Sequence, residues 1–199
     1  MPETIQSIGG LLYGALHETF YKPSTLRNRM YKKLIPLVFF VWALVTVHMP
    51  LHAQKLASPG AKTVLTVGGK IGQTNGQGLA RLDMVMLNAL PQRTIRTRTP
   101  WYPGVTEFTG PSLADVLSLV EGSGTSLRAT ALNDYSIVIP VSDAVDHQAV
   151  LATLLNGKPM SVRDKGPVFL IYPFDSKEQL RTSTFYERSI WQLKSLELE

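Results

Sequence analysis

The segment TIRTRTPWYPGVTEFTG, residues 94–110, carries side chains that could hold a flat organic ligand. Its first part predicts a strand, with Thr97 and Thr99 on one side and arginines on the other. Trp101 and Tyr102 follow among prolines and a glycine, which interrupt regular structure, so we expect both rings on a stiff irregular loop. Planar ligands are often held on such loops, although Trp101 could equally be a core residue at a strand end.

A second polar and aromatic group, Asn133, Asp134 and Tyr135, falls between two predicted strands. Such a triplet can simply close an Asx turn, because asparagine and aspartate side chains accept hydrogen bonds from the backbone two residues on. It can also face a pocket. The sequence leaves both interpretations open.

The absence of cysteine excludes several kinds of chemistry. Thiolate nucleophiles, iron–sulfur sites, zinc ribbons and c-type haem attachment all need this residue. His147 is the only histidine after residue 53, which excludes a multi-histidine metal site in that part of the chain. It lies beside a predicted helix, so we expect a surface or helix-start residue rather than a catalytic base.

Residues 30–53 have the pattern of a secretory signal peptide. MYKK supplies the basic n-region, residues 34–47 the apolar h-region, and Ala53 ends a small-residue cleavage site. We therefore expect cleavage and a periplasmic protein, with residues 54–199 as one domain. The alternative is an uncleaved inner-membrane anchor formed by residues 34–49. Residues 1–29 fit no secretory pattern, so we expect Met30 to be the true start and residues 1–29 to be an extension; an amphipathic prefix is the alternative.

The charge of the chain depends strongly on this leader. Five of the 20 Lys and Arg residues and two of the 15 Asp and Glu residues precede residue 54. The remaining part therefore carries 15 basic and 13 acidic side chains, a net charge of +2. Such a balance lacks the strongly basic surface of a nucleic-acid-binding protein, so nucleic acid is not expected as a partner.

Hydrophobic periodicity and turn residues predict a mixed α+β domain rather than a doubly wound one, because the connections are short and irregular. The glycine-rich segment after residue 67 lacks the spacing of a phosphate-binding loop. Helices are expected over residues 80–90, 111–124 and 143–155, the second with Ser112 as N-cap and Gly122 as stop. Strands are expected over residues 63–67, 94–100, 127–131, 136–140, 160–163, 168–172 and 189–198.

Several segments together resemble the molybdopterin-binding domain of the sulfite oxidase type. They read VLTVGGKI, LDMVMLNALPQ, TRTPWYPGVTEFTGPSLADVL, ALNDYSIVIP, NGKPMSVRDKGPVFLIYP and ERSIWQLKSLEL. ALNDY and MSVRDKGP are the most telling, and the resemblance covers nearly all of residues 54–199. It implies a mixed β-sheet domain with short helices that holds a pterin in a surface cleft.

In catalytic members of this family, a cysteine on the strand that corresponds to residues 94–100 binds molybdenum. The resemblance places that position near Thr97. A threonine hydroxyl is a hard, weakly acidic ligand and cannot replace a thiolate in tuning a molybdenum centre. We therefore expect no bound metal and no catalysis.

The resemblance implies that the pterin part of the site is retained. A pterin presents an N–H and an amino group side by side, which the Asp134 carboxylate could receive as two parallel charge-assisted hydrogen bonds. Asn133 would add a second polar contact, and Trp101 or Tyr135 a flat face for stacking. Cationic side chains could donate hydrogen bonds to the carbonyl oxygen or the hydroxyl groups of the ligand. The remaining candidate residues are Arg98, Thr99, Arg163 and Lys165; a turn cap at Asp134 and a solvated pair of Arg163 with Asp164 are the structural alternatives.

The cysteine-free, exported form is similar to periplasmic proteins that bind reduced pterins. Those proteins are ligand sensors that relay pterin availability to the periplasmic domain of an inner-membrane cyclic-di-GMP synthase/phosphodiesterase, and so control biofilms. The resemblance therefore implies a non-catalytic pterin sensor. A molybdenum-cofactor (molybdopterin) oxidoreductase of the sulfite oxidase family is the alternative, and a scaffold without a ligand is a third possibility.

Overall fold

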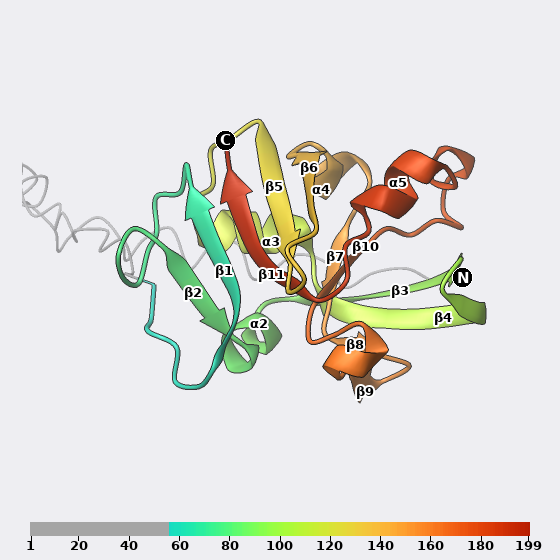
Figure 1. Cartoon of the computed structure of the whole chain (residues 1–199), viewed down its shortest axis with the longest axis horizontal. Helices are drawn as coiled ribbons and strands as arrows, with labels where there is room; N and C mark the ends of the chain where they lie inside the picture. Colours follow the sequence, from blue (N-terminus) through green and yellow to red (C-terminus); the bar gives the residue numbers. More distant parts are fainter. Residues whose placement is uncertain (1–55) are drawn as a thin grey trace, which may run out of the picture. The chain divides into compact units, whose positions relative to one another are not determined.

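The computed structural model describes residues 56–199 as mixed β-sheets with a few short helices (Figure 1). The predicted α+β class is confirmed. The expected signal peptide, the start at Met30 and the alternative anchor at residues 34–49 all lie outside the described residues. Among residues 56–199, no helix is long and apolar enough to cross a membrane.

The largest sheet has five strands in the order β2-β1-β11-β5-β6. The parallel pairing of β1 with β11 places the last strand of the chain in the middle of the sheet, and the other pairings are antiparallel. Figure 1 shows the strands side by side, with α3 behind them. Their bounds are β1 (Thr63–Gly69), β2 (Ala80–Asp83), β5 (Ser126–Ala131), β6 (Ser136–Pro140) and β11 (Leu193–Leu198).

The helix expected over residues 80–90 is wrong in its first turn. Ala80 pairs with Val67 of β1, so this part of the chain is β2 and the helix α2 runs only over Met84–Ala89. Asp83 ends the strand and caps the helix: its carboxylate accepts from the backbone N–H of Met86 at 2.9 Å. It also accepts from the backbone N–H groups of Gly60 and Ala61, which precede β1, at 2.8 and 2.9 Å. The Met86 bond, with help from these two, lowers the pKa of Asp83 although burial opposes the shift.

The predicted second helix is confirmed as α3 (Leu113–Leu119). Its N-cap is Ser112, whose hydroxyl accepts from the backbone N–H of Asp115 at 3.0 Å, as the capping pattern predicts. Leu113, Val116 and Leu117 turn into the core that also contains the inward side chains of the five-stranded sheet. Each fully buried leucine or valine stabilises the fold by about 1.5–3 kcal/mol relative to an exposed one.

A long hairpin, β3 (Gln92–Thr99) with β4 (Tyr102–Pro111), extends from the core and begins a four-stranded sheet in the order β3-β4-β8-β9 (Figure 1). The predicted arginine-rich strand is confirmed. The irregular loop expected around Tyr102 is wrong, because Tyr102 pairs with Thr99 and only Trp101 stays in the turn. The strand passes through Gly104 at a φ of +70°, a conformation that glycine adopts without strain.

The helix expected over residues 143–155 is also wrong beyond its first turn. Only α4 (Asp143–Asp146) is helical, and β7 (Val150–Ala152) and β8 (Leu154–Leu155) follow. All three residues of β7 are buried and pair with the equally buried β10 (Phe169–Ile171). Pairing between two buried strands outweighs the helical spacing of apolar residues, which for so short a run cannot distinguish the two structures.

Two further predictions need correction, while the buried strand expected at residues 168–172 is confirmed as β10. Residues 160–163 form no strand: β9 (Lys158–Pro159) precedes them, and the 3-10 helix η1 (Val162–Asp164) begins within them. The last strand begins at Leu193, and a register shift lies between Leu193 and Ser195. Leu193 and Leu196 are consequently both buried, although strict alternation places them on opposite faces.

The C-terminal part contains η2 (Glu178–Leu180) and α5 (Ser183–Arg188) before β11.

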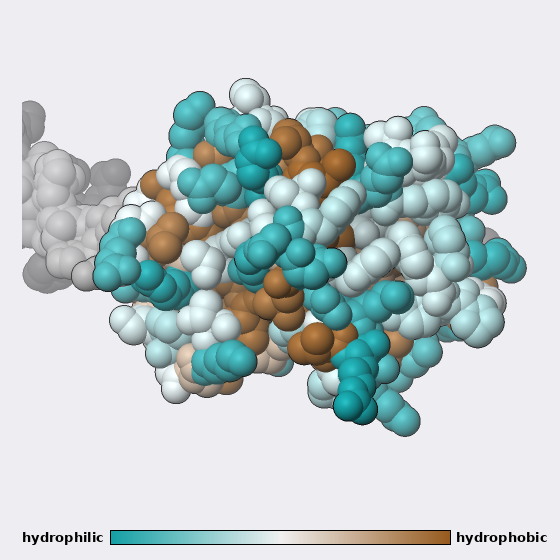
Figure 2. Space-filling model, in the orientation of Figure 1, coloured by the Kyte–Doolittle hydropathy of each residue, from teal (hydrophilic) through white to brown (hydrophobic). Residues whose placement is uncertain are grey.

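On the face shown in Figure 2, hydrophobic residues reach the surface between hydrophilic residues over the five-stranded sheet. Hydroxyl side chains lie in register across four of these strands, in the order Thr66, Ser195, Thr130 and Ser136.

Candidate functional site

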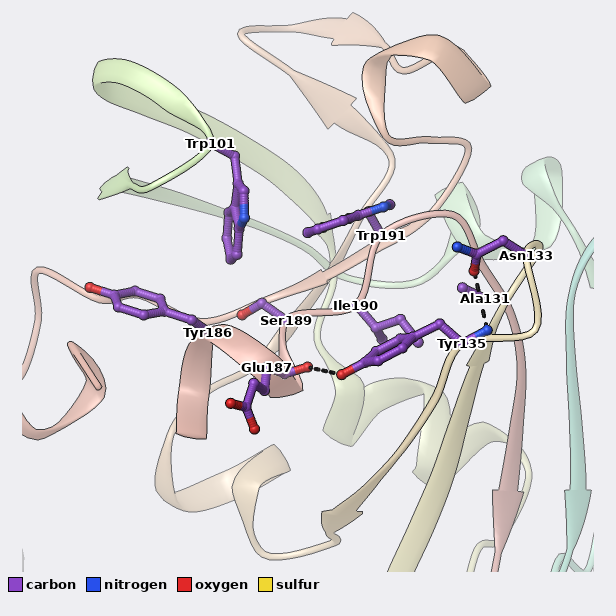
Figure 3. Close-up of a pocket in the computed structure, with 9 residues that line it drawn as sticks. All are labelled: Trp101, Ala131, Asn133, Tyr135, Tyr186, Glu187, Ser189, Ile190 and Trp191. Atoms are coloured by element: carbon purple, nitrogen blue, oxygen red, sulfur yellow. Dashed lines mark hydrogen bonds between the residues drawn. The ribbon is translucent and has the colours of Figure 1, made fainter. Parts of the chain in front are cut away.

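A pocket of about 390 Å³ lies where three separate parts of the chain meet (Figure 3). The turn between β3 and β4 supplies one wall, the end of β5 and the following turn supply a second, and α5 with the segment after it supplies the third. The volume falls within the range of about 300–1,000 Å³ that is usual for small-molecule sites. The lining residues are Trp101, Ala131, Asn133, Tyr135, Tyr186, Glu187, Ser189, Ile190 and Trp191.

Trp101 lines the pocket and also packs against the core. Its ring lies 5.6 Å from the ring of Trp191 and 6.1 Å from that of Tyr186, both nearly perpendicular. Behind it, the ring of Phe169 lies at 5.6 Å. Figure 3 shows Trp101 and Trp191 on one side of the pocket and Tyr135 on the other. The rings therefore offer several aromatic faces and edges to a flat ligand.

The turn between β5 and β6 places two of the predicted site residues in the pocket. The Asn133 side-chain oxygen accepts from the backbone N–H of Tyr135 at 3.2 Å, so the Asx turn exists. The same residue also lines the pocket, and its amide nitrogen makes no hydrogen bond within residues 56–199. The Tyr135 hydroxyl donates to the backbone oxygen of Glu187 at 3.5 Å, which joins this turn to α5 (Figure 3).

Asp134 does not line the pocket. It occupies the left-handed position of the turn, with a φ of +65°, and its side chain is 83% exposed. Its carboxylate contacts the Lys194 ammonium on β11. The structure thus places the predicted pterin carboxylate on the surface, engaged with a cation.

Glu187 is the acidic residue among those that line the pocket, and sequence reasoning missed it. Its side chain is exposed, and within the described part of the chain its carboxylate has no ion pair or hydrogen bond. Figure 3 shows it at the edge of the pocket beside Tyr135. The only signal for it was its place in the segment YERSIWQ, whose neighbours Tyr186 and Trp191 also line the pocket.

Thr97 is fully buried, and its hydroxyl is used by the fold. Its oxygen accepts from the backbone N–H of Asp175 at 3.0 Å, and the Asp175 carboxylate in turn accepts from the backbone N–H of Arg98 at 2.9 Å. The donor that the resemblance places nearest the metal position is therefore a neutral hydroxyl closed off from solvent. This position does not fit a molybdenum ligand.

The other residues of the same hairpin also make local contacts. The Thr99 hydroxyl oxygen accepts from the backbone N–H groups of Trp101 and Tyr102, at 3.3 and 3.2 Å, and so closes the turn. The Arg98 guanidinium lies 3.4 Å from Asp175 and is 71% exposed. Neither Thr99 nor Arg98 lines the pocket.

The segment around η1 lies outside the pocket but supports it. Arg163 is exposed, and the Asp164 carboxylate accepts from the Ser161 hydroxyl at 2.7 Å rather than forming the pair with Arg163 that was the structural alternative. The Lys165 ammonium lies 4.6 Å from the centre of the Trp191 ring, a cation–π contact. The cation therefore holds one of the pocket rings without lining the cavity.

Within residues 56–199, no three metal-binding side chains of the His, Cys, Asp and Glu types come together. His147 follows α4 at its C-terminal end and is partly buried, so the prediction of a surface or helix-start position is wrong. The helix expected over residues 143–155 ends at Asp146, so His147 lies at its C-terminal end instead of near its start. Its ring packs edge-on against Phe185, with 4.8 Å between ring centres.

Residues 77–175 match the family described as "Oxidoreductase molybdopterin binding domain". This match supports the predicted type of fold, and it includes Trp101, Asn133 and Tyr135 but not the wall formed by α5. A search of curated proteins found no match.

Among solved structures, the chain is similar to the sulfane dehydrogenase SoxCD from Paracoccus pantotrophus, at 14% sequence identity and a TM-score of 0.49. The similarity covers 67% of this chain and 37% of that chain. The present chain thus spans well under half of the length of the protein that it matches.

Proposed function

We propose that this protein, which carries the oxidoreductase type of molybdopterin-binding domain, binds the ring system of a pterin in the aromatic pocket and does not use Thr97 as a metal ligand. The observation that carries the proposal is the combination of four aromatic rings with a carboxylate and an amide nitrogen that make no hydrogen bond within residues 56–199. These are Trp101, Tyr135, Tyr186 and Trp191, with Glu187 and Asn133.

The chemistry of these groups matches that of a pterin. An aromatic contact with a flat ring contributes about 0.5–1.5 kcal/mol beyond the buried area. The Glu187 carboxylate can accept the N–H and the amino group of the ligand as two parallel charge-assisted hydrogen bonds. The free amide N–H of Asn133 can donate to the ring carbonyl. Glu187 takes the role first expected of Asp134, because Asp134 lies outside the pocket and contacts Lys194.

The finer role that we propose is that of a periplasmic ligand sensor. The leader-like sequence of residues 30–53 and the resemblance to pterin-binding regulatory proteins support it. Bound pterin would favour one state of the surface and so change the affinity for the periplasmic domain of an inner-membrane cyclic-di-GMP synthase/phosphodiesterase, the route to biofilm control. The pterin is a regulatory ligand in this proposal, because its binding changes the affinity of the protein for the partner.

Calorimetric titration of the purified protein, after removal of any bound pterin, tests the proposal. We expect saturable binding of 6-hydroxymethylpterin or tetrahydrobiopterin, weakened by Glu187→Gln and unchanged by Asp134→Asn. Absence of binding by either pterin would refute the proposed ligand. Equal weakening by both substitutions would show a general charge effect instead of recognition by Glu187.

A further inference from the structure

Helix α5 presents two chemically different sides. Tyr186 and Glu187 line the pocket, whereas the next residue, Arg188, does not. The Arg188 guanidinium donates to the Asp143 carboxylate of α4 at 2.9 Å. Only 4% of the Asp143 side chain and 22% of the Arg188 side chain are exposed. Adjacent residues of one short helix thus belong to the ligand pocket and to a buried ion pair.

The buried ion pair is completed by a third group. The Tyr172 hydroxyl, on a fully buried side chain, donates to the same carboxylate oxygen at 2.8 Å. Burial, together with the neighbouring Asp143 charge, raises the pKa of Tyr172 far above its usual range, so this residue remains the donor. The carboxylate therefore has a cation and a hydroxyl as fixed partners, as a buried charge requires.

Helix α5 depends on this cluster for its position. It has six residues, its N-cap Thr182 makes no side-chain capping bond, and none of its residues is fully buried. So short a helix has little stability of its own. The helix is held by the Tyr186 ring, which packs against Trp101 and Phe174, and by the Tyr135 hydrogen bond to the Glu187 carbonyl. At its C-terminal end it is held by Arg188 and by Phe185, whose ring lies 5.2 Å from that of Tyr172.

We infer that Arg188 is a positioning residue for ligand recognition: its ion pair with Asp143 holds α5 so that the Glu187 carboxylate meets the amino edge of the ligand. The inference rests on the proposed pterin site. A helix that can shift by a fraction of an ångström still closes the pocket, but it no longer aligns two parallel hydrogen bonds. Arg188 then contributes to discrimination between ligands more than to their overall retention.

The test compares two ligands that differ only at the amino edge. Lumazine has the same bicyclic ring as pterin, with a carbonyl oxygen in place of the amino group. We expect the wild-type protein to prefer pterin by about tenfold or more, since lumazine lacks the amino group that donates one of the two charge-assisted hydrogen bonds. Arg188→Met is expected to remove most of this preference, and Arg188→Lys to keep part of it, because lysine restores the charge without the planar fork.

The matched control is Arg181→Met. Arg181 lies just before α5, is exposed, and makes no ion pair within the described residues. Its substitution should leave the preference for pterin over lumazine unchanged. Circular dichroism and Tm measured on every variant report whether the fold is kept. If Arg188→Met does not fold, Asp143→Asn and Arg188→Lys carry the test, because both retain a hydrogen bond in the cluster.

The outcomes separate the inference from the proposed function. If the wild-type protein binds neither ligand, the pterin site itself is wrong. If it binds pterin and the folded Arg188 or Asp143 variants lose affinity for both ligands by the same factor, Arg188 has a structural role only and the inference is overturned. A loss confined to the pterin affinity supports it.

Discussion

The surroundings of Thr97 and the aromatic pocket share one hairpin, yet they treat their polar groups differently. The Thr97 hydroxyl is buried and accepts a hydrogen bond from the backbone of Asp175. In the pocket, the carboxylate of Glu187 and the amide nitrogen of Asn133 make no hydrogen bond within residues 56–199. Polar groups that the fold satisfies serve stability, whereas those left open at an aromatic pocket are available to a ligand. The contrast favours ring binding over metal ligation.

The largest effect is expected at Trp101, the residue that links the hairpin to the pocket. Trp101→Ala should remove the contacts with Phe169 and Trp191 and the main stacking surface. We expect a loss of stability of about 2–4 kcal/mol, slightly less than for a fully buried tryptophan, and at least a tenfold loss of pterin affinity. Denaturant unfolding and titration measure the two effects. Trp101→Phe is the control and should recover most of both; unchanged binding by the alanine variant would exclude Trp101 from the site.

The next largest effect is expected at Glu187. Glu187→Gln keeps the size of the side chain but removes the charge that strengthens the hydrogen bonds. We expect a loss of pterin affinity of about 10–100-fold, corresponding to 1.5–3 kcal/mol, with Tm unchanged because the side chain is exposed. Calorimetry on this variant and on Asp134→Asn makes the comparison. A larger loss at Asp134 would return the recognition of the amino edge to the residue first predicted.

At Thr97 we expect the opposite of Glu187, namely a loss of stability with little change in pterin affinity. Thr97→Val retains the shape but leaves the backbone N–H of Asp175 without its acceptor, which should lower the free energy of unfolding by about 1–3 kcal/mol. Pterin affinity should stay within about twofold of wild type, a difference of ~0.4 kcal/mol. Urea denaturation and titration of the same preparation give both values. A large loss of affinity with little loss of stability would place Thr97 in the ligand site and remove the contrast.

The smallest effect is an acid dependence that lies outside both regions. Hydrogen bonds lower the folded-state pKa of Asp83, so its contribution to stability is fully present above the unfolded-state pKa of about 3.9. That contribution is lost as the pH falls through the lower, folded-state pKa. The stability difference between wild type and Asp83→Asn should therefore be constant near neutral pH and shrink in strong acid. A difference that shrinks between pH 7 and pH 5 would contradict this origin.

Local signals in the sequence were enough for the regular part of the fold. The alternation at β1, β5 and β6 and the capping pattern at Ser112 predicted these elements, because each depends on residues close in sequence. The segment around β7 was misread as helix, since its partner β10 lies elsewhere in the chain. Leu193 and Leu196 of β11 are both buried because of a register shift in the pairing with β5, which local alternation does not reveal.

The residues that line the pocket were predicted in part for the same reason. Turns can be recognised in the sequence, and three of the pocket residues lie at turns: Trp101, Asn133 and Tyr135. Glu187 and Trp191 come from a segment more than fifty residues further along the chain, and only the tertiary fold brings them to the pocket. The carboxylate of Asp134 makes it the predicted partner of the ligand, but the turn geometry directs that side chain to Lys194.

The most direct measurement of the central claim is mass spectrometry and metal analysis of the small molecules released from the protein purified from its native host. We predict a pterin in near-stoichiometric amount without molybdenum, and its loss from the Glu187→Gln variant. Stoichiometric molybdenum with molybdopterin would contradict the account, and it would require a metal ligand other than the buried Thr97 hydroxyl.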